Sequence, residues 1–223
     1  KTDFSGYPVL RSNQRGRVDT NASVMTTRFD AGTRHWFAAD REWQTTWRIQ
    51  GWEENRSNGT VLAVNRGRAL DLSARLDRVA QPDEWAMENI LFHQERRFAS
   101  TFTSVTPDRS SETLSLDQHN VPSRATGIIQ RIRIPLSQTH QIGAGWDTRF
   151  ISGSTNEYFF LQHGSLARER SAGGRQVQTG VFLLDTWRPA KDWTIEAGTR
   201  LDRMDQRRGS LTETARADGA ILK

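Results

Sequence analysis

Arginine is the residue type in this sequence with the clearest binding chemistry. A guanidinium group presents a planar fork of N–H donors that fits carboxylate and phosphate groups. Seven arginines lie in two long polar stretches of the chain: Arg96, Arg97, Arg109, Arg124, Arg168, Arg170 and Arg175. We treat them as candidate ligand-binding residues for an anion, with solvation of a polar loop as the alternative.

The sequence lacks the residue patterns of catalysis. It has no cysteine, which excludes a disulfide framework, a thiol nucleophile and a cysteine-ligated metal. Its five histidines are scattered along the chain, and no two of them lie four residues apart. Neither a G-x-S-x-G elbow nor a glycine-rich phosphate loop occurs. We therefore expect no catalytic residues, no metal site, no cofactor and no enzymatic activity.

Composition narrows the class of protein further. The 223 residues carry a net charge of +5, which is spread along the chain and does not indicate a nucleic-acid partner. Only 35% of the residues are hydrophobic, yet eight Trp and ten Phe argue against disorder, since disordered chains are poor in aromatic residues. No apolar run is as long as the roughly 20 residues that a transmembrane helix needs. The chain is therefore structured but does not span a membrane with helices.

The elements that must position these residues are strands, because apolar residues recur at every second position. The stretches 43–50, 70–77, 142–150 and 193–202 each place apolar side chains on one face and polar side chains on the other. The predicted strands are Arg17–Phe29, Glu42–Gly51, Arg68–Arg78, Glu84–His93, Ala125–Ile134, His140–Ile151, Gln178–Arg188 and Trp193–Arg203. They exceed the usual strand of about 5–6 residues and match the roughly 9–11 that a membrane-spanning strand needs.

The connections between these strands alternate in length. Short turns are expected near Gln81, Ser137 and Ala190, and long polar loops at 52–67, 94–124 and 152–177. The first connection, Ala31–Arg41, is longer than a tight turn and departs from the alternation. Short turns at one end and long loops at the other are typical of a transmembrane β-barrel. We predict an all-β, antiparallel, up-and-down partial barrel of about eight strands that forms an open curved sheet; a soluble β-sandwich is the alternative.

The two faces of the strands are assigned by the cost of burying charge. A Lys or Arg on the lipid face at the middle of a bilayer costs roughly 2–4 kcal/mol, so the charged faces should line the lumen. The expected lumen-facing residues are Asp147, Arg149, Glu196, Arg200 and Asp202. The expected lipid-facing residues are Trp43, Trp47, Trp146, Trp193 and Ile195. Several of these Trp residues, together with Trp85, lie near strand ends, where an aromatic girdle is expected.

The hairpin 178–203 carries a more specific pattern. Gly180, Phe182, Asp185 and Trp187 form G-x-F-x-x-D-x-W, and the next strand ends in G-x-R-x-D at residues 198–202. This hairpin resembles those in the barrels of TonB-dependent outer-membrane receptors. The resemblance covers roughly residues 40–205 and implies part of a 22-stranded barrel in the bacterial outer membrane. It also implies import of a scarce nutrient, such as a ferric siderophore, and energy coupling to the TonB system through a plug domain.

The resemblance gives the candidate arginines two further interpretations. They could contact an anionic ligand such as a siderophore, or the phosphates of lipopolysaccharide in the surrounding membrane. We expect residues 1–223 to be one partial barrel domain cut from a longer chain, with the plug domain absent. Three alternatives stay open: a small complete outer-membrane barrel of eight to ten strands acting as a porin or adhesin, a soluble sandwich that binds carbohydrate through exposed Trp, and an outer-membrane enzyme.

Overall fold

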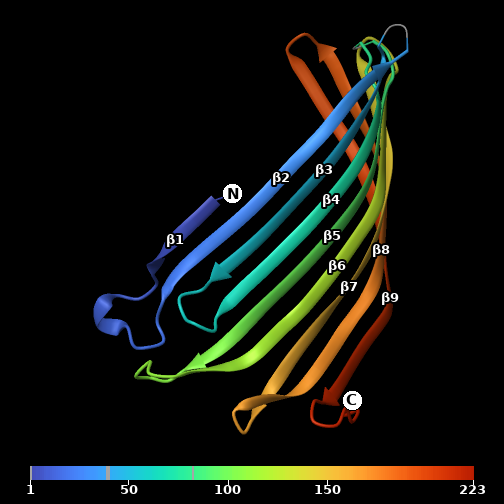
Figure 1. Ribbon diagram of the computed structural model, residues 1–223. Helices are drawn as coiled ribbons and strands as arrows, with labels where there is room; N and C mark the ends of the chain where they lie inside the picture. The colour runs from blue at the N-terminus through green and yellow to red at the C-terminus, as the bar shows by residue number, and fades with distance from the viewer. Residues whose placement is uncertain (1, 39–40, 82) are drawn as a thin grey trace.

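The computed structural model describes residues 2–38, 41–81 and 83–223 and arranges them as one antiparallel sheet. Nine strands follow one another in chain order across the sheet, each paired with its neighbours in sequence (Figure 1). They are β1 (Thr2–Pro8), β2 (Asn21–Phe37), β3 (Trp43–Ser57), β4 (Val64–Arg78), β5 (Ala86–Val105), β6 (Glu112–Pro135), β7 (His140–Gln162), β8 (Ser165–Ala190) and β9 (Trp193–Ala215). A single turn of 3-10 helix, η1 (Ser12–Gln14), lies between β1 and β2.

The predicted fold class is confirmed. All eight predicted strands are present, and the sheet is antiparallel, up-and-down and curved (Figure 1). Within the described residues β1 and β9 do not pair with each other, so the sheet is open. The ninth strand, β1, was not predicted, because Gly6 and Pro8 favour a turn. Gly6 has a φ of 90°, and the pairing of β1 with β2 shifts register between Phe4 and Tyr7.

The three predicted long loops are wrong as loops, because most of their residues extend the strands. The stretch 52–67 is interrupted only at 58–63, the stretch 94–124 only at 106–111, and the stretch 152–177 only at 163–164. Their sequences are polar on both faces, which removes the alternation by which a strand is recognised. A ladder of backbone hydrogen bonds does not need that alternation where both faces meet water.

The short turns all lie at one end of the sheet, as predicted. The connections near Gln81, Ser137 and Ala190 stand together at the top of Figure 1, and the η1 segment lies at the opposite end. The first connection, expected at Ala31–Arg41, is strand up to Phe37, and its residues 39 and 40 lie outside the described residues. We call the two ends the turn end and the loop end.

A single sheet of this kind encloses no hydrophobic core. Among the described residues the only buried apolar side chains are Val18 and Leu166, whereas many large apolar side chains are exposed. A soluble domain covers the apolar face of a sheet with a second layer, which the described residues do not form. This arrangement contradicts the β-sandwich alternative and leaves an apolar face that needs an apolar surrounding. In the described part of the chain, no helix is long and apolar enough to cross a membrane.

Candidate functional site

The candidate site is the sheet itself, whose two faces differ in chemistry. Residues directly opposite each other on antiparallel strands share a face, so the register assigns every side chain. One face, which we call the apolar face, carries Phe37, Trp43, Trp47, Ile49, Leu72, Leu91, Ile128, Ile132, Trp146, Phe150, Val181, Leu183, Trp187, Ile195 and Leu201. Trp193 precedes Ile195 by two positions in β9 and shares its face. All five residues predicted to face lipid therefore lie on the apolar face.

The opposite face, which we call the charged face, carries the five residues predicted to face the lumen. Asp147 and Arg149 in β7 share it with Glu196, Arg200 and Asp202 in β9. Charged side chains from the other strands join them: Asp30, Arg48, Asp71, Arg75, Asp77, Glu88, Arg96 and Arg131. The separation of the two sets thus runs from β2 to β9, with charged exceptions on the apolar face that include Asp185 in β8 and Arg203 and Asp205 in β9.

The charges on this face are paired across strands. Glu88 accepts from two arginines at once, at 3.0 Å from Nη2 of Arg75 and at 3.0 Å from Nη1 of Arg131. Arg75 also donates to Asp77, which accepts from Gln44 at 2.9 Å. This chain of contacts links β3, β4, β5 and β6. It lines a hollow of about 420 Å³ together with apolar residues of β8.

Glycine at one position allows a longer cross-strand contact. Arg200 in β9 reaches over β8 to Asp147 in β7, with Nη2 at 2.8 Å from the carboxylate, and also binds Asp202 at 2.7 Å. It passes over Gly180, where an added Cβ would lie 2.1 Å from the same Nη2. The G-x-F-x-x-D-x-W pattern therefore begins with a glycine because a charged side chain lies across that position.

Two aromatic rings lie over glycines on the charged face in a similar way. A Cβ at Gly127 would meet the ring of Phe92 at 2.5 Å, and a Cβ at Gly145 would meet the ring of Phe182 at 2.5 Å. Gly145 is also tight against backbone, since its Cβ would lie 2.4 Å from the carbonyl oxygen of Gln130. These glycines let rings lie flat along the sheet, a packing known to support strand glycines.

An aromatic cluster occupies the turn end of the apolar face. Trp43 stacks on Phe37 with ring centroids 6.4 Å apart and meets Trp85 edge-on at 6.2 Å. His140 stacks on Trp187 at 5.6 Å. Aromatic residues gathered at one level of a sheet are typical of a membrane–water interface.

The apolar face has the height of a membrane core. We call the belt the part of the sheet between this aromatic cluster and the row of facing residues Ala31, Ile49, Leu72, His93, Thr126, Phe150 and Val177. In β7 the belt runs from His140 to Phe150. At roughly 3.4 Å per residue and a tilt of about 45°, such a strand rises by about 25 Å, the height of the apolar band of outer-membrane barrels.

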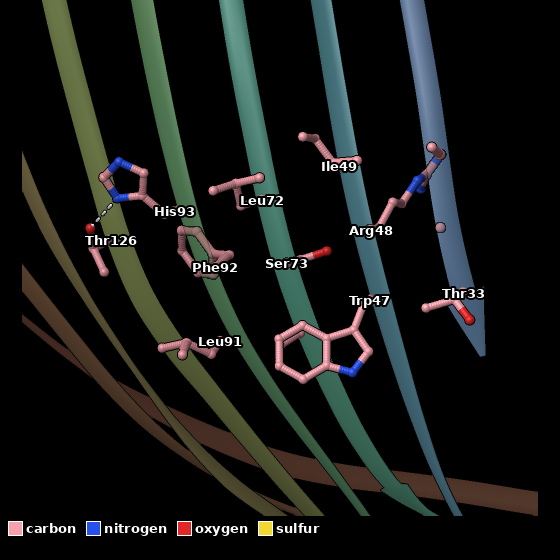
Figure 2. A pocket seen from close by; sticks show the side chains of 13 residues that line it. Thr33, Trp47, Arg48, Ile49, Leu72, Ser73, Leu91, Phe92, His93 and Thr126 are labelled. Carbon is pink, nitrogen blue, oxygen red and sulfur yellow. Dashed lines mark hydrogen bonds between the residues drawn. The ribbon is translucent and has the colours of Figure 1, made fainter. Parts of the chain in front are cut away.

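Within the belt lies a shallow apolar groove of about 590 Å³. Figure 2 shows Trp47 of β3 in the middle of this groove, with Leu72 on the neighbouring strand β4 and Leu91 one strand further on, in β5. His93 and Thr126 close one side and are joined by a 2.7 Å hydrogen bond. Sequence reasoning identified Trp47 but not the groove, because the groove is formed by side chains from five strands.

Of the candidate arginines, Arg109 has a structural partner that the sequence did not reveal. It lies in the β5–β6 turn and donates to Asp19, in the β1–β2 connection, through Nε at 2.7 Å and Nη2 at 2.5 Å. The hydrogen bond from Arg109, with a further one from the backbone of Gly16, lowers the pKa of Asp19 to about 2. Asp19 is nearly buried, with 6% of its side chain exposed. We call this contact the latch.

A second carboxylate strengthens the latch from β6. Glu112 accepts from the Thr60 hydroxyl at 2.5 Å and from the Leu62 backbone N–H at 2.9 Å, both in the β3–β4 turn. Burial would raise the pKa of Glu112, but these hydrogen bonds lower it below its ordinary value. Three connections far apart in sequence are therefore held together at the loop end. Asp19, Thr60 and Glu112 carry no local sequence signal for this role.

The remaining candidate arginines lie in strands rather than loops. Arg96 binds Asp71 on the charged face at 2.6 and 2.9 Å. Arg170 binds Glu157, with Nε at 2.6 Å, and its guanidinium lies 4.6 Å from the ring centre of Phe159.

The other four candidates differ in their partners. Arg168 lies 4.1 Å from the ring centre of Phe160, and Arg124 binds Glu95 at 3.0 Å. Within the described residues, no carboxylate lies within 4 Å of Arg97 or Arg175. The seven arginines therefore do not converge on one ligand site.

A comparison with models of known protein families matches residues 3–220 to the TonB-dependent receptor-like β-barrel family. The chain belongs to this family. A search of curated proteins gives no match. As a TonB-dependent receptor barrel, the chain has an outer-membrane receptor or transporter role, and the resemblance of its hairpin 178–203 to that family is confirmed.

Proposed function

We propose that residues 1–223 form one partial barrel domain of a receptor that imports a scarce nutrient, such as a ferric siderophore, across the bacterial outer membrane. The observation that carries the proposal is the separation of apolar and charged side chains on opposite faces of one sheet from β2 to β9. Membership of the TonB-dependent receptor family supports the same role. The proposal includes no catalytic step, because receptors of this family are transporters.

The apolar face meets lipid in this proposal. Leu183 and Val181 are about half exposed in the described sheet, and the aromatic cluster lies at one boundary of their belt. In water this exposed apolar surface would favour aggregation, whereas in hydrocarbon its exposure carries no free-energy penalty. Reversing the faces would place Arg200, Asp202 and Asp147 in hydrocarbon at several kcal/mol for each charge.

The charged face lines a hydrated passage. Its ion pairs are partly exposed, as at Arg200 and Asp147, so solvent screens them and each contributes little to stability. Their value lies in keeping the wall polar and its charges neutralised, so that a polar ligand can pass without binding tightly. Energy for transport comes from the TonB system through a plug domain, as the family implies.

The ligand is captured at the loop end. There, guanidinium groups lie against rings on both faces of the sheet: Arg168 against Phe160 and Arg170 against Phe159, and, on the face opposite to Phe159, Arg216 at 3.9 Å from the ring centre of Tyr158, on which His119 stacks at 4.1 Å. The contacts of Arg168 and Arg170 offer both stacking and charge to an aromatic or anionic ligand. This supports a siderophore-like nutrient over a simple ion.

Two neighbouring substitutions in β9 of the full-length receptor test the assignment of faces. Ile195→Arg places a charge on the apolar face and should impair membrane assembly, measured as heat-modifiable gel mobility and surface protease protection. Glu196→Arg introduces the same side chain on the charged face and should assemble normally, with at most a change in nutrient uptake. Equal assembly of both variants, or failure of Glu196→Arg alone, would contradict the proposal.

A further inference from the structure

The apolar face carries a basic hollow just beyond the loop side of the belt. It has a volume of about 580 Å³ and we call it the headgroup hollow. Arg97 and Arg124 line it from β5 and β6, and Arg175 and Arg208 line it from β8 and β9. Small residues complete the lining: Ser152, Gly153, Ser154, Gly173 and Gly174. A wide space edged by arginines and filled by no side chain is suited to a bulky anion.

Positive charge in this hollow exceeds the negative charge available to neutralise it. The one lining carboxylate, Glu95, is bound to Arg124. Arg97, Arg175 and Arg208 have no carboxylate within 4 Å among the described residues. Like charges also stand directly opposite each other, because Arg97 faces Arg68 and Arg175 faces Arg207; Arg68 also faces Glu53 on β3, and Arg207 is bound to Asp205 at 3.4 Å. Such cross-strand pairs are destabilising unless an anion lies between them.

A strained backbone position aims one of these arginines at the hollow. The β8–β9 ladder shifts register between Gly173 and Arg175, and Arg208 lies in the bulge with a φ of 53°. A left-handed conformation is uncommon for a residue other than glycine, and such strain persists mainly at functional sites. Bulges of this kind redirect a side chain. The irregularity therefore adds Arg208 to the same surface as Arg175.

The headgroup hollow continues into the apolar groove of the belt. An intermediate hollow of about 490 Å³ shares Arg124 and Arg175 with the headgroup hollow. It shares His93 and Thr126 with the apolar groove drawn in Figure 2. One surface thus passes from unpaired guanidinium groups, past a hydroxyl and an imidazole, to Trp47 and Leu91. It has the polarity profile of a lipid with an anionic headgroup.

We propose that this surface binds a lipid that carries phosphate groups on its headgroup, as lipopolysaccharide does in the outer leaflet. The arginines hold the phosphates, and the acyl chains lie along the intermediate hollow and the apolar groove. Phosphate fits because guanidinium binds it through two parallel hydrogen bonds. The inference rests on the proposed outward orientation of the apolar face, since only then does the headgroup hollow meet the leaflet at headgroup depth.

Lipid retention by the full-length receptor tests this site. The receptor is reconstituted in phosphatidylcholine nanodiscs doped with diphosphorylated lipid A, and bound lipid A is counted by native mass spectrometry. Arg97→Gln and Arg175→Gln should each weaken retention about fivefold, because one arginine near an anionic lipid surface strengthens binding by about that factor. The double variant should weaken retention more strongly. Arg188→Gln, at the exposed turn end, is the matched control and should have no effect.

Three outcomes would overturn the proposal. The double variant could retain as much lipid A as the wild type, lipid A without phosphates could bind equally well, or millimolar inorganic phosphate could displace the lipid completely. Lysine at both positions should restore much of the retention, which excludes a merely structural effect. If the lipid A retention test fails while Ile195→Arg still shows impaired membrane assembly, the lipid site alone is refuted. Normal assembly of Ile195→Arg would refute the orientation itself.

Discussion

The belt and the strand extensions beyond it are built on the same backbone ladder but carry different sequences. In the belt, β8 places Val181, Leu183 and Trp187 on the apolar face, with Asp185 as the charged exception among them, and Phe182, Leu184 and Thr186 on the other face. In the extension of the same strand, both faces are polar across residues 168–176, yet pairing to β7 and β9 continues. Backbone pairing between strands therefore does not depend on the side-chain pattern. The alternation arises where one face meets an apolar surrounding and the other meets water.

The two regions also use charge differently. In the belt, ion pairs such as Arg75–Glu88 line one face and keep it polar and hydrated. At the loop end, Arg109 and Asp19 join connections that are 90 residues apart in sequence. Charges in the belt thus shape a surface, whereas charges at the loop end fix the positions of connections.

The two regions should differ most in how a charge placed on the apolar face changes the free energy of unfolding. Leu183→Arg lies in the middle of the belt and should cost about 2–4 kcal/mol, because the guanidinium enters hydrocarbon. Thr212→Arg lies on the same face of β9, beyond the belt, and should be nearly neutral because it stays in water. Urea unfolding of the assembled receptor in lipid measures both. Equal costs would mean that the belt does not end where we place it.

A smaller effect should come from adding one methyl group to a strand glycine in each region. Gly145→Ala should destabilise the belt by about 1–3 kcal/mol, since the new Cβ would lie 2.4 Å from a backbone oxygen and 2.5 Å from Phe182. Gly209→Ala in the extension meets nothing within 4 Å and should be neutral or slightly stabilising. The same unfolding assay compares them. If Gly145→Ala leaves the free energy of unfolding unchanged, the backbone and Phe182 can shift enough to accommodate the added methyl group.

The smallest effect on global stability should come from the latch, which we expect to act locally. The lowered pKa of Asp19, about 2, means that the latch is stabilising above the ordinary carboxylate pKa of 3.8 and is lost only as pH falls through 2. Limited pepsin digestion should therefore leave the β5–β6 turn protected near pH 3 and expose it near pH 2. Asp19→Asn should expose it at both values.

Asp108→Asn is the matched control for the latch. Its pKa is also lowered, by hydrogen bonds from Thr106 and Ser110, but all three residues lie in the same turn. Removing this carboxylate should leave the β1–β2 connection in place and the digestion pattern unchanged. Cleavage of Asp108→Asn as fast as Asp19→Asn would show that the turn itself, and not the cross-loop contact, provides the protection.

The sequence alone determined the strands of the belt, their antiparallel order and the membership of each face. A period of two is a local property, and a shift of one residue would exchange the faces completely, so Ile195 and Glu196 were assigned without a structure. The family resemblance was likewise carried by one local hairpin. Only the tertiary structure decided that the polar stretches 94–124 and 152–177 are mostly strand, because a ladder in water leaves no periodic signal. It alone also decided that Arg109 binds Asp19 while Arg97 and Arg175 find no carboxylate partner among the described residues, because cross-strand register and loop contacts bring together residues that are distant in the chain.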